Sequence, residues 1–315
     1  YRRTGQAPAR GGRRHGGGDG PPPKGEPDDP SYDTLRIPRF FGKMVRWVPV
    51  SLPDDGPVTA LGVQGGVFWF LNPHGELISM KAAEFGQSHI EGLYAPKLEW
   101  LWRAFPQFNQ QRQWRGFQAQ YARSALMSAA GNKGVFDARD KVRGLGCWKG
   151  DDGELIQHLG DRILIGEAEH KPGEIDGYVY PGRPPVLPPV KGGKAEVEAT
   201  YKMFQTWHWA RGELDARLLI GFMGTGILGA ALDWRPMTFI TGDAGYGKSE
   251  LMNRMKAMLP GRMVATVDAS PAALRQMVNQ DSVMVLFDEI EADALTDQAQ
   301  QVMKLARVAA SGGSV

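Results

Sequence analysis

Residues 242–249 have the composition and spacing of a phosphate-binding loop, Gly-Asp-Ala-Gly-Tyr-Gly-Lys-Ser. Glycines let successive backbone N–H groups turn inward around a phosphate, and a helix that begins after the loop adds partial positive charge. Lys248 is expected to reach the β- and γ-phosphate oxygens as a point charge, and the Ser249 hydroxyl is expected to coordinate Mg²⁺. The pattern therefore predicts a site for ATP and Mg²⁺ with Lys248 as a catalytic residue.

The segments on either side of the loop fit the same prediction. Residues 237–241 are a short apolar run typical of a strand, and residues 250–259 have the composition of a helix. Strand, loop and helix in this order are the context that the motif requires. The predicted nucleotide-binding residues are Gly242, Asp243, Ala244, Gly245, Tyr246, Gly247, Lys248, Ser249 and Glu250.

Two carboxylates follow a second apolar run, residues 283–287. Such a run is typical of a buried strand in a parallel sheet, and ligands bind at the carboxyl ends of such strands. We expect Asp288 to hold Mg²⁺ through water and Glu289 to act as the second catalytic residue by polarising the attacking water. The alternative is an ordinary strand that ends in solvated acids.

The segments between these motifs alternate between strand and helix patterns. Residues 263–267 are a strand candidate, and Ser270 and Pro271 open a helix candidate that ends near residue 278. Residues 195–211 and 214–232 are further helix candidates, the second with an uncharged run too short to span a bilayer. This alternation predicts an α/β fold for residues 195–315, a P-loop parallel sheet flanked by helices.

The rest of the chain divides into a tail and a smaller domain. Residues 1–34 are rich in Gly, Pro and Arg, which predicts a disordered linker, with a nucleic-acid-binding arm as the alternative. Residues 35–190 carry short strand patterns around a helical stretch at 97–131, which predicts a smaller α+β domain that precedes the first. Residues 181–193 hold five Pro and three Gly and are expected to form the linker between the two domains.

Composition excludes several classes of protein. The 315 residues carry a formal net charge of only +2, which gives no case for a uniformly basic nucleic-acid binder. Cys147 is the single cysteine, so the chain has no internal disulfide and no zinc site built on cysteines. A reducing, intracellular environment is the simplest expectation.

Beyond the loop motif, the sequence resembles the AAA+ class of P-loop ATPases. It resembles more closely the primase–helicase replication proteins of phages, prophages and plasmids, whose helicase domain is similar to superfamily 3. Residues 232–236 with 241–249, 288–293 with 305–307 and 311–313, and 142–148 with 158–162 carry this resemblance. The last two of these segments are similar to the accessory region before the helicase domain.

The resemblance implies an ATP-dependent helicase that forms a hexamer-like homo-oligomeric ring and moves on single-stranded DNA during replication. It implies a cytoplasmic location, in a bacterial cell or a phage-infected host, and no membrane. It also implies a DNA-contacting loop at Lys304, Arg307, Gly312 and Gly313, although a solvated helix end explains these residues equally well. The family's sensor residue and arginine finger would follow Val315, and any primase centre would precede Tyr1, so we expect a fragment truncated at both ends.

Two alternatives to the helicase stay open at this point. One is an AAA+ loader or remodeller that acts on protein, and the other is a nucleotide-binding DNA-interaction module without turnover. Two aromatic groups also suit base stacking, but few basic residues interleave with them, which favours core packing; they are Trp100, Trp102 and Trp114, and the pair Trp207 and Trp209.

Overall fold

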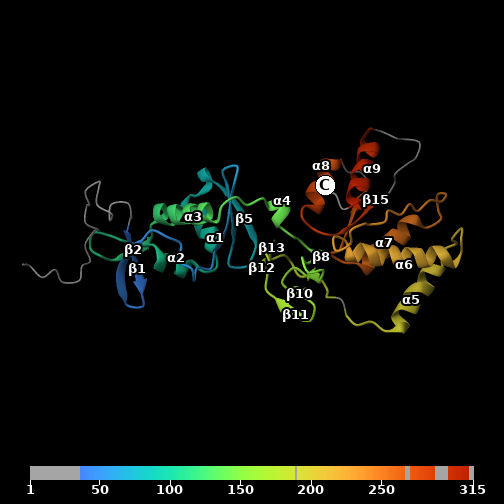
Figure 1. The fold of residues 1–315 in the computed structure, drawn as a ribbon, viewed down its shortest axis with the longest axis horizontal. Helices are drawn as coiled ribbons and strands as arrows, with labels where there is room; N and C mark the ends of the chain where they lie inside the picture. The colour runs from blue at the N-terminus through green and yellow to red at the C-terminus, as the bar shows by residue number, and fades with distance from the viewer. Residues whose placement is uncertain (1–35, 189, 267–269, 288–296, 312–315) are drawn as a thin grey trace, which may run out of the picture.

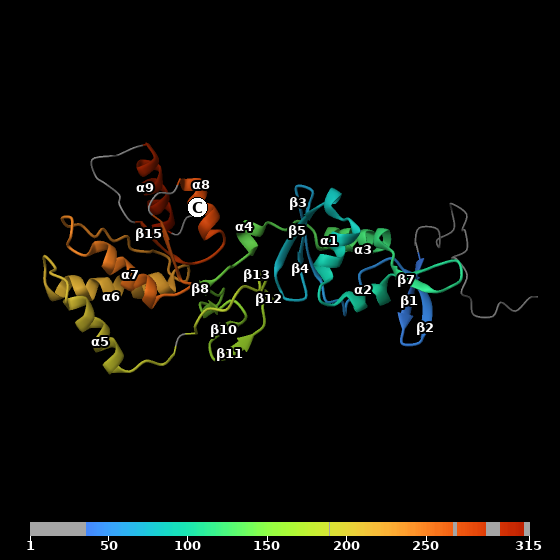
Figure 2. The same cartoon turned by 180° about the vertical axis from the view of Figure 1, so that it is seen from behind.

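The computed structural model describes residues 36–188, 190–266, 270–287 and 297–311, and the chain forms an elongated molecule (Figure 1). Three groups of elements follow one another along its long axis, and the reverse view shows the same order (Figure 2). The predicted tail, residues 1–34, lies outside the described residues. Within the described part of the chain, every helix is too short or too polar to cross a bilayer.

The first group combines antiparallel strands with three α-helices. A hairpin comes first (β1, Arg36–Phe41; β2, Met44–Pro49), followed by a three-stranded meander (β3, Thr59–Gln64; β4, Val67–Leu71; β5, Leu77–Lys81). Gly65 and Gly66 form the two-residue turn between β3 and β4 with φ of +58° and +78°, as such a hairpin requires. A 3₁₀ turn (Ala82–Glu84) leads to the helices (α1, Gln87–Tyr94; α2, Leu98–Ala104; α3, Ala119–Lys133).

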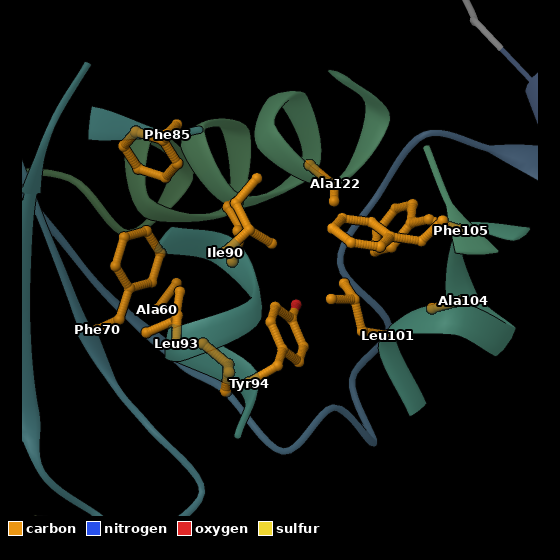
Figure 3. Packing of buried hydrophobic residues seen from close by; sticks show 14 of the residues in the cluster. Ala60, Phe70, Phe85, Ile90, Leu93, Tyr94, Leu101, Ala104, Phe105 and Ala122 are labelled. Atoms are coloured by element: carbon orange, nitrogen blue, oxygen red, sulfur yellow. The ribbon is translucent and has the colours of Figure 1, made fainter. Parts of the chain in front are cut away.

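The helices of this group cover the meander through a continuous apolar core (Figure 3). Phe70 from β4, Tyr94 from α1 and Phe105 after α2 are each at most 1% exposed. Burying one such aromatic side chain contributes about 1.5–3 kcal/mol to folding. Trp100 stacks on Tyr94, with ring centroids 5.5 Å apart. This tryptophan therefore packs against the core, the alternative that the sequence favoured over base stacking.

A hairpin interrupts the helical stretch predicted at 97–131. Its strands are β6 (Pro106–Phe108) and β7 (Trp114–Phe117), and they separate α2 from α3. Pro106 cannot donate a hydrogen bond to a continuing helix. The Asn109 side chain accepts backbone N–H bonds from Gln111 and Gln113 at 3.0 and 2.8 Å, which fixes the turn. The prediction of one helical stretch was therefore wrong for residues 105–118.

The middle group is a small β unit after a short helix (α4, Ala138–Lys141). Four strands form an antiparallel sheet in the order β11-β10-β9-β8 (β8, Gly146–Lys149; β9, Leu155–His158; β10, Ile163–Ile165; β11, Ala168–His170). A second hairpin lies beside it (β12, Gly173–Ile175; β13, Tyr178–Tyr180). The Arg143 guanidinium stacks 3.3 Å over the Tyr178 ring and donates to the Tyr180 hydroxyl, which ties this hairpin to the chain before β8.

The third group contains the predicted phosphate loop. Its elements are α5 (Lys194–Gln205), α6 (Glu213–Leu228), α7 (Lys248–Met258), β14 (Met263–Thr266), α8 (Pro271–Val278), β15 (Met284–Phe287) and α9 (Asp297–Ala310). Side chains of α5, α6, α7, β14 and β15 share one apolar core. The Ser270 hydroxyl accepts from the N–H of Ala273 and Pro271 takes the first helical position, so α8 starts where the sequence predicts.

The predicted fold class was wrong. Among the paired strands that the structure describes, only β14 and β15 run parallel, and the other sheets are antiparallel. Residues 237–241 form no strand, and Met237 and Phe239 in this segment are 40% and 63% exposed. The chain leading into β15 pairs instead with the middle group, since the Ser282 N–H donates to the Leu145 carbonyl at 2.7 Å. A parallel sheet flanked by helices is therefore not what these residues form.

This junction between the middle and third groups is closely packed. Gly146 has φ of +115°, and a methyl group on its α-carbon would collide with the Ser282 carbonyl. Asp281 accepts from the Leu145 N–H at 2.9 Å, and burial raises the pKa of its carboxyl. His158 is completely buried with Nδ1 3.1 Å from the Arg143 carbonyl, and burial lowers the pKa of its ring.

Arg235 joins the segment before the phosphate loop to the end of α9. Its guanidinium donates to the Gly229 carbonyl at 2.8 Å and to the Ala309 carbonyl at 2.7 Å. Its backbone N–H also donates to the Ala310 carbonyl at 2.8 Å. The last carbonyls of a helix lack partners within the helix, so this arginine both satisfies them and complements the helix dipole.

Candidate nucleotide-binding site

The loop at 242–249 leads directly into α7. Gly245 and Gly247 have φ of +84° and +80°, in the left-handed region that residues with a Cβ rarely adopt. Gly247 is the N-cap of α7, and Lys248 is its first residue. The glycine spacing seen in the sequence therefore matches the two positions where the backbone needs it.

The Lys248 side chain folds back over the loop. Its ammonium donates to the Gly242 carbonyl at 2.5 Å and to the Asp243 carbonyl at 3.1 Å. A lysine ammonium has three donors, and these two bonds hold it at the mouth of the loop, next to the start of α7. The positive charge thus lies where the helix N-terminus also favours an anion.

Trp207 supports the loop from the segment between α5 and α6. Its indole N–H donates to the Gly247 carbonyl at 3.1 Å. The same carbonyl accepts from the Leu251 N–H at 2.9 Å, within α7. Because a trans peptide holds its C=O and N–H in opposite directions, fixing this carbonyl also fixes the direction of the Lys248 N–H. Trp207 is a positioning residue for the loop.

The apolar face of α7 anchors the loop to the rest of the third group. Leu251 and Met255 are at most 1% exposed and pack among side chains of α6, β14 and β15. Phe204 at the end of α5 joins the same core, three residues before Trp207. The start of α7, with its free N–H groups, is therefore held on a packed scaffold rather than on an exposed turn.

Chemically, this arrangement suits a polyanion with closely spaced oxygens. The first N–H groups of a helix have no partners within it, and here a lysine ammonium lies beside them. Phosphate groups take both kinds of donor. Ser249 is exposed in the first turn of α7, where its hydroxyl is accessible to a metal ion bound with the phosphates.

The remaining predicted loop residues are more peripheral. Tyr246 at the tip is 64% exposed, and its N–H contacts the Asp243 carbonyl at 3.4 Å. Ala244 is exposed beside it. Glu250 accepts from Arg254 at 2.6 Å along the exposed face of α7, so its carboxylate is held by a neighbouring helix residue.

The second predicted motif lies outside the part of the chain that the structure describes. Asp288 and Glu289 follow the last residue of β15 and lie outside the described residues, as do Gly312 and Gly313. Lys304 and Arg307 are exposed on α9, one turn apart on the same side of the helix. Their roles in Mg²⁺ binding, water activation and DNA contact stay predictions.

No protein-family model, curated protein or solved structure matches the chain. The evidence for a nucleotide site is therefore the geometry of the loop and of the residues that support it.

Sequence reasoning missed one residue that supports the loop, Trp207, and one that anchors the segment before the loop, Arg235. Trp207 was assigned to core packing together with Trp209, and its bond to the loop depends on a contact across 40 positions. Arg235 was noted only as part of a resemblance, and its partners lie 6 and 74 positions away. No local pattern in the sequence indicates what Trp207 and Arg235 contact, because the partners of both include residues far away in the chain.

Proposed function

We propose that this chain binds Mg-ATP at residues 242–249 and hydrolyses it, as the ATPase module of a helicase that moves on single-stranded DNA. One observation carries the nucleotide site. The Lys248 ammonium is held at the start of α7 by the carbonyls of Gly242 and Asp243, and the loop turns into the helix through two glycines in the left-handed conformation. The helicase activity and a ring of identical subunits rest on the sequence resemblance alone.

The residues of the loop fit a triphosphate by their chemistry. Backbone N–H groups at the start of α7 would bind phosphate oxygens, and Lys248 would exchange its carbonyl partners for the more negative β- and γ-phosphates. Ser249 and Asp288 would hold Mg²⁺, which neutralises charge on the phosphates and so favours transfer to water. Trp207 would keep the loop in its binding conformation.

Hydrolysis needs a group that orients water, and we assign that role to Glu289. A carboxylate placed after a strand can accept the proton of an attacking water. Lys248 contributes charge stabilisation where negative charge develops. These two residues act on different parts of the reaction, so their substitution should separate binding from turnover.

The test measures phosphate release from Mg-ATP by the protein expressed up to its natural stop codon, with and without single-stranded DNA. We expect turnover that increases with DNA, disappears in Lys248→Ala and disappears in Glu289→Gln while ATP binding is kept. Turnover stimulated by unfolded protein instead of DNA would identify a remodeller. ATP binding without turnover under every condition would refute the ATPase proposal and leave a nucleotide-binding module.

A further inference from the structure

A second surface, at the far end of the molecule from α9, combines exposed rings with positive charge. The hairpins β1–β2 and β6–β7 form it, and Figure 2 shows β7 beside β1. On these hairpins Phe41 is 47% exposed, Met44 57% and Trp114 48%. Large apolar side chains that stay this exposed are more costly in water than in contact with a partner.

Ring contacts hold the two hairpins against each other. Phe40 of β1 lies 5.8 Å from Phe108 of β6, measured between ring centroids. Phe108 is the cross-strand partner of Trp114, and Trp114 lies 5.2 Å from Trp102 of α2. Trp102 and Phe108 are half-buried, and Trp114 packs against Trp102 while half of its own surface stays exposed.

The two hairpins themselves carry charge of one sign. Residues 36–49 contain four Lys or Arg, residues 106–117 contain two Arg, and neither segment contains Asp or Glu. The nearest acids lie outside the hairpins, where Glu99 pairs with Arg103 at 3.6 Å. Arg39 points inward, where it donates to the Ala104 carbonyl and lies over the Phe105 ring. The exposed cations beside the rings include Lys43, Arg46 and Arg115. The net charge of the whole chain is only +2, so this concentration is local.

We propose that this two-hairpin surface, defined by Phe41, Lys43, Met44, Arg46, Trp114 and Arg115, binds single-stranded nucleic acid. Bases stack on exposed aromatic rings in a sequence-tolerant manner, and cations beside the rings contact the phosphates. Arg46 already lies 5.8 Å from the Phe41 ring, so cation and ring occur together. A duplex hides the faces of its bases and cannot use the rings in this way.

The chemistry of the hairpin turn separates this partner from an anionic membrane. The turn between β6 and β7 is rich in amides, including Gln110, Gln111 and Gln113, rather than apolar side chains. Amides suit the hydrogen-bonding edges of bases, whereas a membrane-inserting turn needs apolar residues. The surface uses none of the residues of the nucleotide site and does not rest on the proposed ATPase.

The test follows binding of fluorescently labelled dT30 and rU30 to the whole chain by anisotropy, without nucleotide. Both strands should bind with similar affinity, because bases and phosphates are common to them, and a 30-base-pair duplex should bind at least about tenfold more weakly. Trp114→Leu should weaken binding about tenfold, and Trp114→Phe should restore most of it because it keeps a ring. Thermal melts followed by circular dichroism confirm that each variant is folded.

Salt dependence tests the cations separately. The triple variant Lys43→Gln/Arg46→Gln/Arg115→Gln should reduce the slope of log affinity against log salt by about 2, since each phosphate contact on a single strand contributes about 0.7. A control triple with Gln at three exposed lysines of other segments should leave the slope unchanged. These control positions are Lys171, Lys191 and Lys194.

Several results would overturn the proposal. These are no binding of dT30 by the unsubstituted chain at low salt, equal slopes for the two triple variants, or a more than tenfold preference for duplex, for one sugar or for anionic lipid vesicles. Loss of binding only when Lys304 and Arg307 are replaced would also overturn it, because the DNA contact would then lie on α9. A defect in ATP binding leaves this measurement unaffected, so the two proposals fail separately.

Discussion

Replacing Trp207 by Phe tests whether the loop is held in place from outside. The substitution keeps an aromatic ring in the core but removes the N–H that donates to the Gly247 carbonyl at 3.1 Å. That carbonyl keeps its second donor, the Leu251 N–H at 2.9 Å, so it is not left without a partner. The peptide between Gly247 and Lys248 should therefore become more mobile without a collapse of α7.

The expected magnitude follows from the loss of one neutral hydrogen bond. Such a bond contributes about 1 kcal/mol net, and the remaining partner on the carbonyl avoids the larger penalty of an unsatisfied group. If this free energy serves to hold the loop in its binding conformation, the affinity for Mg-ATP should fall about fivefold. The turnover number should fall less than the affinity, since Lys248 and Glu289 are unchanged.

Titration of a fluorescent ATP analogue with Mg²⁺ measures this effect directly. Trp209→Phe is the matched control, because its indole donates to the Phe204 carbonyl at 2.7 Å and does not contact the loop. The control variant should lose stability but keep its affinity for the nucleotide. Equal affinities in the unsubstituted chain and Trp207→Phe, or equal losses in the two variants, would refute the positioning role.

Three further predictions concern stability, measured by urea unfolding followed by circular dichroism. Arg235→Gln should lower the free energy of unfolding by about 2 kcal/mol, because charged hydrogen bonds to two main-chain carbonyls are lost. The control Arg217→Gln, at an exposed ion pair, should change the free energy of unfolding little. A similarly small change in both variants would contradict the capping role of Arg235. Gly146→Ala should lower the free energy of unfolding more than Gly153→Ala does. Both glycines have positive φ, but only a methyl group at position 146 would collide with the Ser282 carbonyl. The reverse order would contradict the close packing of the junction. Burial lowers the pKa of His158, so the unfolded chain binds the proton more tightly and the free energy of unfolding should fall as the pH drops below about 6.5. His158→Gln should reduce the fall in this free energy between pH 7.5 and 5.5 by up to about 1.4 kcal/mol. An unchanged fall in the variant would show that His158 is not its source.

Local signals in the sequence predicted several elements correctly. The Gly65-Gly66 pair between apolar runs indicated the β3–β4 hairpin, because a tight turn needs positive φ at both positions. Ser270 and Pro271 indicated the start of α8. In the loop, the glycines and Lys248 act within a few residues of one another, so their spacing alone predicted their arrangement.

Features that depend on distant contacts were not predictable in the same way. Residues 237–241 have a strand pattern, but a strand needs a partner, and Ser282 before β15 pairs with Leu145 instead. The helical prediction for residues 97–131 was based on patterns at 98–102 and 116–130, and between them Pro106 and the Asn109 turn favour a hairpin. Both errors arise because the composition of a segment indicates which secondary structures it can form, but not which other segment it will pair with in the fold.

The two-hairpin surface illustrates the same limit for function. Trp114 was assigned to the core because few basic residues surround it in sequence. The cations Lys43 and Arg46 come about 70 positions earlier, and the Phe40–Phe108 contact shows that the two hairpins meet. Only the fold brings the rings and the charges onto one surface.

Calorimetric titration of Mg-ATP into the whole chain tests the central claim most directly, with Lys248→Ala measured in parallel. We predict saturable binding to one site per chain with a dissociation constant between about 1 μM and 1 mM, the range of ordinary enzyme–substrate affinities. Lys248→Ala should bind at least about tenfold more weakly, since a charged bond to phosphate is lost. Absence of binding by the unsubstituted chain, or equal binding by both proteins, would contradict a phosphate-binding loop at residues 242–249.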